Sequence, residues 1–199
     1  MKKVMLLIML SGLWHRSLTQ THGGVGQYLY ITPRHSLTIV PVVYFQSSNN
    51  WYAEGRYNYE ALKTLSVYAG KVFEKEATVS YSVSPIIGAV LGQFNGGSVG
   101  ANGELNYHRL FFSSQLQYTF SAKHHTENFL YSWSDLSYQI LNNIYTGISV
   151  QQTNLYKLPS RLEEGFFIKA LFNKWTMPLY FFNPASKQRY FVLGLTRDW

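Results

Sequence analysis

The chain has 199 residues, and its charged fraction of 14% is well below the roughly 25% that is usual in soluble domains. It contains no cysteine, which excludes a disulfide framework. Its formal charge is +7, but the sequence has no run of basic residues of the kind that binds nucleic acid. No linker-like stretch divides the sequence, so we expect one domain.

The first residues have the features of a secretory signal peptide. Lys2 and Lys3 precede an apolar stretch over residues 4–10, which is much shorter than the about 20 residues of a membrane-spanning helix. Ser17 and Thr19 stand at the spacing that predicts cleavage before Gln20. We therefore expect a signal peptide over residues 1–19 and a mature domain over 20–199, with an uncleaved N-terminal anchor as the alternative. Loss of the leader lowers the formal charge to +4.

The rest of the sequence falls into stretches with alternating apolar and polar residues, which is the period of a β-strand. In chain order these predicted strands cover residues 26–32, 35–46, 51–60, 62–73, 77–91, 97–107, 110–121, 127–139, 142–154, 162–173, 175–183 and 189–199. No helix-length apolar run follows the leader, so any membrane residence must come from strands. The prediction is an all-β, antiparallel transmembrane β-barrel of 12 strands, with 10 or 8 strands as alternatives.

The predicted connections alternate in length, as they do in outer-membrane barrels, where short periplasmic turns alternate with longer outer loops. The connections at 47–50, 74–76, 108–109, 140–141 and 173–174 are short. Those at 92–96, 122–126, 155–161 and 183–188 are generally longer, and only the tight connection at 60–62 departs from the pattern.

Alternation also predicts which side chains face which way. In the stretch 110–121, Phe112 and Leu116 belong to a mostly apolar set that we expect to face lipid, whereas Gln115 and Gln117 belong to a polar set that we expect to face the lumen. A soluble lipocalin-like or sandwich protein would reverse this assignment, so the period alone does not choose between the two classes.

The end of the chain favours the membrane class. Residues 189–199 place one apolar series on a single face and finish in an aromatic residue; that series is Phe191, Leu193, Leu195 and Trp199. This segment resembles the C-terminal strand of Gram-negative outer-membrane β-barrel proteins, which the barrel-assembly machinery recognises. The whole mature chain also resembles their small, functionally uncharacterised type, with residues 51–60 and 133–138 as its more distinctive stretches. The resemblance implies a bacterial outer-membrane location, lipid and assembly-machinery partners, and a monomer by default.

A polar set of side chains is predicted to face the lumen: Glu54, Arg56, Asn58, Glu60, Glu104, Asn106 and Lys169. Charges buried in a barrel need partners, and acids and bases on facing walls supply them. The set predicts either a polar channel or ligand cavity, or an internal salt-bridge network that plugs a narrow barrel. We favour the plug, since Tyr68, Tyr145 and Phe167 should also project inward.

Histidines are the residues on which a catalytic or metal site would depend. His124 and His125 fall in a predicted outer loop without the further ligands that zinc requires, so we expect no metal and no cofactor. None of the histidines stands beside a serine in a known catalytic pattern. The functional prediction is thus a non-enzymatic, porin-like integral barrel that serves as a narrow pore or a structural surface element. An outer-membrane enzyme that acts on lipid or peptide at the outer rim is the alternative.

Two further groups of residues carry predictions about the membrane. Trp51, Tyr52, Trp133 and Trp175 are expected to form the aromatic girdles at the two interfaces, with a sugar-stacking platform as the alternative. Cations in or beside the predicted outer loops could hold the phosphates of lipopolysaccharide, against the alternative of ordinary solubilising charge. The residues chosen for that rim are Lys123, Lys157, Arg161 and Lys187.

Overall fold

The computed structural model describes residues 21–33, 37–155 and 161–199 as a β-barrel. The predicted signal peptide lies outside this range. The strands, in order, are β1 (His22–Ile31), β2 (Leu37–Gln46), β3 (Trp51–Tyr57), β4 (Thr64–Lys71), β5 (Phe73–Lys75), β6 (Ser80–Gly92), β7 (Gly96–Tyr107), β8 (Leu110–Ser121), β9 (Phe129–Leu141), β10 (Ile144–Leu155), β11 (Arg161–Phe172), β12 (Trp175–Phe182) and β13 (Tyr190–Asp198). A single 3-10 turn, η1 (His125–Glu127), precedes β9.

The barrel is antiparallel and closed. Apart from β4 and β5, strands that follow one another in sequence pair with each other, and β1 pairs with β13 along almost its whole length, from Gly24 opposite Asp198 to Ile31 opposite Phe191. Strands β4 and β5 both pair with β6 and are separated only by Val72, so together they act as one strand of the wall. The result is a closed 12-strand barrel, which confirms the predicted fold class.

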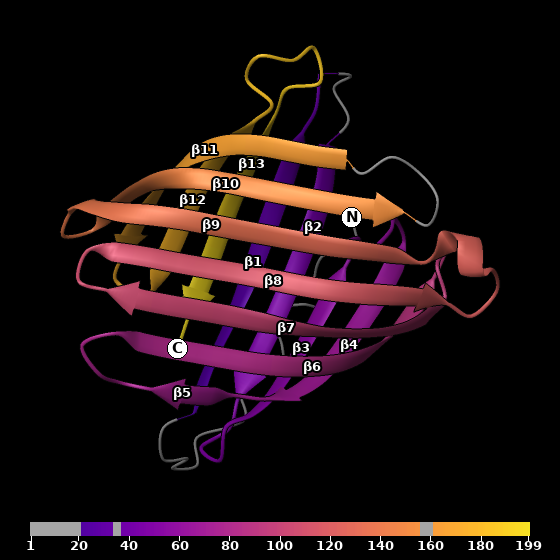
Figure 1. Ribbon diagram of the computed structural model, residues 1–199, viewed down its shortest axis with the longest axis horizontal. Coiled ribbons are helices and arrows are strands. Elements are labelled where there is room, and N and C mark those ends of the chain that lie inside the picture. The colour runs from indigo at the N-terminus through magenta and orange to yellow at the C-terminus, as the bar shows by residue number, and fades with distance from the viewer. Residues whose placement is uncertain (1–20, 34–36, 156–160) are drawn as a thin grey trace, which may run out of the picture.

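Figure 1 shows the two walls of this barrel, with β6–β11 in the near wall and β1–β4, β12 and β13 in the far wall, crossing at a steep angle. The first and last strands begin and finish at one end, together with short turns such as Asn142–Asn143 and Asn173–Lys174. We call this the terminal end. The opposite end, which we call the loop end, carries the connections at 58–63, 93–95, 122–128 and 183–189.

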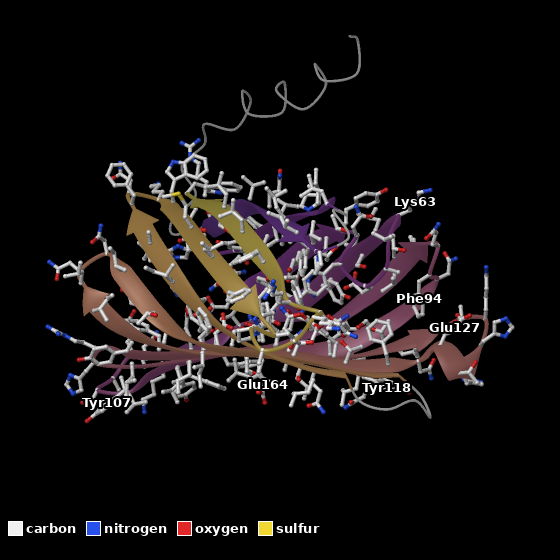
Figure 2. All side chains as sticks on the ribbon, turned by 90° about the horizontal axis from the view of Figure 1, so that it is seen from above. Lys63, Phe94, Tyr107, Tyr118, Glu127 and Glu164 are labelled. Carbon is white, nitrogen blue, oxygen red and sulfur yellow. The ribbon has the colours of Figure 1, made fainter. Side chains whose placement is uncertain are left out.

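The wall is apolar outside and largely polar inside. On β8, Phe112, Leu116 and Phe120 are exposed on the outer surface, whereas Gln117 and Thr119 are buried within the barrel. Neighbouring strands repeat the arrangement, because successive side chains of a strand point to opposite faces and register is preserved from strand to strand. Figure 2 shows Tyr107, Tyr118 and Glu164 on the outside of the wall. Apolar residues facing outward are the pattern of a barrel in lipid.

Part of the interior is a packed apolar cluster. Phe167, Tyr180, Phe182, Tyr190 and Val192 form it from β11, β12 and β13, and the half-buried side chains of Tyr28, Tyr30 and Trp133 pack against it. Phe182 and Val192 are completely buried. This cluster occupies part of the interior along β11, β12 and β13.

The structure corrects several details of the sequence predictions. Strand β1 begins at His22 rather than residue 26, and residues 140–141 belong to β9, so the turn that follows falls at Asn142–Asn143. Trp133 and Tyr52 are not girdle residues, because both side chains point into the barrel. Their register explains the error, because both residues alternate with outward-facing neighbours, whereas the girdle prediction rested on residue type alone. Trp51 and Trp175 do lie on the outer surface. Among the described residues, no helix is long and apolar enough to cross a membrane.

Candidate pore lumen

Three cavities follow one another through the interior. The loop-end cavity has a volume of about 300 Å³ and is lined by aromatic and uncharged polar residues together with Glu60. The central cavity, of about 360 Å³, contains Glu54, Arg56, Glu104, Asp135 and Lys169 in its wall. The terminal-end cavity is larger, about 590 Å³. The central and terminal-end cavities share five lining residues, namely Tyr28, Tyr52, Asn102, Glu104 and Thr176, whereas the central and loop-end cavities share only Tyr59.

The boundary at Tyr59 is made by the connection between β3 and β4. Asn58 adopts a φ of 60°, in the left-handed region that asparagine tolerates well. Its side-chain oxygen accepts a hydrogen bond from the Lys63 backbone N–H at 2.6 Å, and its own backbone N–H donates to the Thr64 carbonyl at 2.9 Å. These bonds close the connection into a compact loop, and Tyr59 and Glu60 enter the barrel from it.

Tyr59 meets a ring from the opposite wall. Its centroid lies 5.7 Å from that of Tyr131 on β9, in an edge-to-face arrangement that aromatic pairs favour. The Tyr59 hydroxyl lies 2.8 Å from the side-chain amide of Gln115 on β8. The ring is therefore held from two strands across the lumen. We call Tyr59, Tyr131 and Gln115 the waist of the barrel.

Arg56 contacts Tyr59 of the waist and stabilises its position. Its guanidinium donates to both carboxylate oxygens of Glu54, at 2.6 and 3.0 Å, and to Gln117 at 3.0 Å. The same group lies 4.5 Å from the Tyr59 ring centroid and 3.7 Å from the carboxylate of Glu60. Because the planar guanidinium offers several donors in fixed directions, one side chain compensates two buried acids and also stacks on the Tyr59 ring.

Glu60 is well satisfied although it lies in a loop. Its carboxylate accepts hydrogen bonds from the hydroxyls of Ser66 and Tyr68 and from the Gln117 amide, the last at 3.3 Å. The loop is thereby tied to β4 and β8, which fixes the position of Tyr59. Movement of this loop would require these charge-assisted bonds to break.

A second polar cluster lies across the lumen on β9, β10 and β12. Asp135 accepts hydrogen bonds from Trp133 Nε1 at 2.9 Å, from the Ser149 hydroxyl at 2.6 Å and from the Tyr180 hydroxyl at 2.8 Å. All three donors are neutral, so the negative charge of Asp135 is solvated but not cancelled. Lys169 interacts electrostatically with Asp135 and Glu104 without contacting either closely enough to form an ion pair, and its ammonium lies 5.1 Å from the Tyr145 ring.

The structure places the predicted lumen residues as follows. It brings Glu54, Arg56 and Glu60 into one network. Glu104 and Lys169 both line the central cavity. Asn58 closes its own loop and borders the loop-end cavity. Asn106 lies on the inward register of β7, away from that network.

The remaining predicted residues lie at the rim and on the outer surface. Lys123 and Lys187 are exposed in loop-end connections, Lys157 lies outside the described residues, and Arg161 begins β11 with a side chain outside the described part. Phe191, Leu193, Leu195 and Trp199 face outward from the last strand and the terminus.

Sequence reasoning missed two central residues. Asp135 shares the register of Tyr131 and Trp133 on β9, so the alternation along this strand predicts an inward-facing side chain, and this signal in the sequence was not used. Tyr59 carried no such signal, because alternation does not predict where a turn directs its side chains.

The four described histidines occupy separate positions in the fold or solvent-exposed loops. His22 borders the terminal-end cavity, His108 lies in a turn with its ring against Tyr107, and His124 and His125 are exposed in a loop. The described residues contain no group of three or more histidines or acids arranged to hold a metal ion.

Neither a protein-family model nor a curated protein sequence matches the chain. Among solved structures it is similar to the KdgM porin, with 13% identity, a TM-score of 0.65 and coverage of 87% of this chain and 98% of that one. The KdgM porin in complex with disordered oligogalacturonate gives 12% identity and a TM-score of 0.64, covering 88% of this chain and 98% of that one. The NanC porin gives 11% identity and a TM-score of 0.57, covering 87% of this chain and 97% of that one. The chain therefore has the fold of outer-membrane porins.

Proposed function

We propose that this chain is a narrow pore of the bacterial outer membrane that admits small polar solutes. One observation carries the proposal: three cavities with polar side chains in their walls follow one another through the described part of the barrel, and the loop-end and central cavities meet at the waist formed by a loop residue and two wall residues. A barrel built only as a scaffold would need no such series of polar spaces.

The size of the barrel supports a narrow pore rather than a wide one. Barrels of about 8 strands are filled by side chains, whereas those of 16 to 18 strands leave an open aqueous channel. Twelve strands fall between these cases. The apolar cluster around Phe182 occupies part of the interior and further reduces the open cross-section. We therefore expect a size limit near that of a single small sugar or amino acid.

The porin fold supports an outer-membrane location with the loop end facing outward and the terminal end facing the periplasm, as in single-chain bacterial barrels. Outward-facing Phe191, Leu193, Leu195 and Trp199 support recognition by the barrel-assembly machinery. Lys123 and Lys187 would lie at the outer surface, where they could contact lipopolysaccharide phosphates.

The KdgM structure with bound oligogalacturonate raises the question of whether this barrel also takes a polymer of sugar acids. The lumen of the present chain favours a different class of solute. Glu104 and Asp135 face the central cavity, where a polyanion would have to pass them, and the Arg56 guanidinium is already engaged by Glu54 and Glu60. We propose uncharged and cationic small solutes instead.

A purely structural role is the second candidate, and the apolar cluster favours it because its side chains take up space inside the barrel. A liposome swelling assay separates the two. Proteoliposomes containing the mature barrel should swell in small uncharged sugars, more slowly as the sugar grows, and faster when Tyr59→Ala removes the waist ring. Phe112→Ala, which removes a ring of the same size from the outer surface, is the matched control. Absence of swelling in the smallest sugar for both the natural chain and Tyr59→Ala would establish a dry, structural barrel.

A further inference from the structure

The charges of this protein are sorted between the lumen and the outside. The chain has 17 basic and 10 acidic residues in total. Yet the described residues that line the three cavities include six acids, Glu54, Glu60, Glu74, Glu104, Asp135 and Asp198, and only two lysine or arginine residues, Arg56 and Lys169. The interior of a basic protein is thus acidic.

Most of the remaining described bases lie where the lumen does not reach them. Lys123 and Lys187 are in loop-end connections, and Arg109 and Lys174 are in turns at the terminal end. Lys71 and Arg197 point outward from the wall, each over the ring of a surface tryptophan. The negative charge of the lumen therefore does not follow from the overall composition of the chain, which is basic. It comes from acidic side chains that are directed into the barrel.

The lumen acids are not all neutralised by ion pairs. In the described part of the chain, Arg56 pairs with Glu54 and Glu60, and this trio keeps a net negative charge. Glu104 has no basic side chain within ion-pair distance, and Asp135 is held by three neutral donors. Asp198 accepts a hydrogen bond from the Tyr44 hydroxyl, which is also neutral. Of the two bases in the wall of the central cavity, Lys169 forms no ion pair with a described acid, and it lines that cavity together with Glu104 and Asp135.

We infer that the lumen is a cation-selective filter in which Glu104 and Asp135 determine the preference for cations over anions, and Lys169 opposes them. The inference rests on the proposed pore function and adds the charge class of its solutes. A channel lined by one sign of charge in a low-dielectric wall concentrates counter-ions and excludes ions of the same sign. The acids extend from the central cavity to the terminal end, so a cation that has passed the waist meets negative charge along the rest of its path.

The test is the reversal potential of single barrels in planar bilayers across a KCl gradient at low ionic strength. The natural chain should show a larger permeability for K⁺ than for Cl⁻. Glu104→Gln should lower the permeability ratio about 6-fold, because losing one unit charge roughly 8 Å from the ion in a water-like medium changes the K⁺ and the Cl⁻ permeability about 2.4-fold each, in opposite directions. Lys169→Met should raise the ratio by a similar factor. Both effects should shrink at about 1 M salt, where the Debye length falls to about 3 Å.

Glu164→Gln provides the matched control, because it removes the same charge from the outer face of β11, as Figure 2 shows. It should leave the reversal potential unchanged. Lys169→Met also covers the case in which Glu104→Gln fails to fold. A conducting barrel that prefers Cl⁻, or a ratio that changes in neither lumen variant, would overturn the filter while leaving the pore intact. If neither the natural chain nor Tyr59→Ala carries current, the pore proposal fails and the filter fails with it.

Discussion

Replacement of Arg56 by methionine is the most informative single change to the waist support. Arg56 is only 3% exposed, and it donates at 2.6 and 3.0 Å to Glu54 and at 3.0 Å to Gln117. Removing one partner of a buried ion pair costs about 3–5 kcal/mol, mainly because the other charge is left without compensation. Glu54 would keep the Tyr52 hydroxyl at 2.7 Å, and Glu60 would keep its hydroxyl and amide donors. We therefore expect a loss near the lower limit, about 3 kcal/mol.

The free energy of unfolding can be measured by urea titration of the refolded barrel, with tryptophan fluorescence as the signal. Combining Arg56→Met with Glu54→Gln and Glu60→Gln should recover much of the loss, since the two acids that Arg56 compensated then carry no charge. Arg197→Met removes a guanidinium from the outer surface, over the ring of Trp175, and should change stability by less than about 0.5 kcal/mol. A loss below about 1 kcal/mol for Arg56→Met would refute the reasoning, because it would show that water already compensates these acids.

Three further changes test other parts of the structure. A Cβ on Gly147 would lie 2.1 Å from the Leu136 carbonyl oxygen, so Gly147→Ala should lower the free energy of unfolding in urea by about 1–3 kcal/mol. Gly103→Ala is the control and should be near neutral, because the nearest atom to its Cβ would be 3.9 Å away. Equal effects of the two substitutions would contradict the close packing of β9 and β10. Deletion of Trp199, whose backbone N–H bonds to the Gly23 carbonyl at 3.0 Å, should reduce the outer-membrane yield, and undiminished insertion would mean that the C-terminal resemblance is accidental. Changing Lys123, Lys157, Arg161 and Lys187 together to glutamine should weaken co-purification of lipopolysaccharide, most clearly at low salt; unchanged binding would remove this partner.

The fold was accessible from the sequence because a barrel strand has a period of two and an outer surface that must be apolar. The stretch 110–121 is an example: Leu116 and Gln117 were assigned to opposite faces, and they lie there as β8 of a 12-strand barrel. The same rule extends to every long strand. Trp133 and Tyr52 were misassigned because residue type was used instead of register, and both point inward.

The waist could not be predicted in the same way. Tyr59 enters the lumen because Asn58 turns the chain at a positive φ and Glu60 finds donors on β4 and β8. These are tertiary relationships between residues far apart in sequence, such as Tyr59 and Tyr131, and no local pattern encodes them. The packing of Phe182 against Tyr190 and Trp133 is of the same kind, since it depends on which strands face each other across the barrel.

The central claim is that the waist at Tyr59 is the narrowest point of a conducting path. Single-channel recording of the natural chain and of Tyr59→Ala, side by side in planar bilayers, tests this claim most directly. The account predicts small stepwise currents for the natural chain and clearly larger steps for Tyr59→Ala, with the outer-surface variant Phe112→Ala unchanged. Steps of equal size in all three barrels, or no steps in any of them, would contradict it.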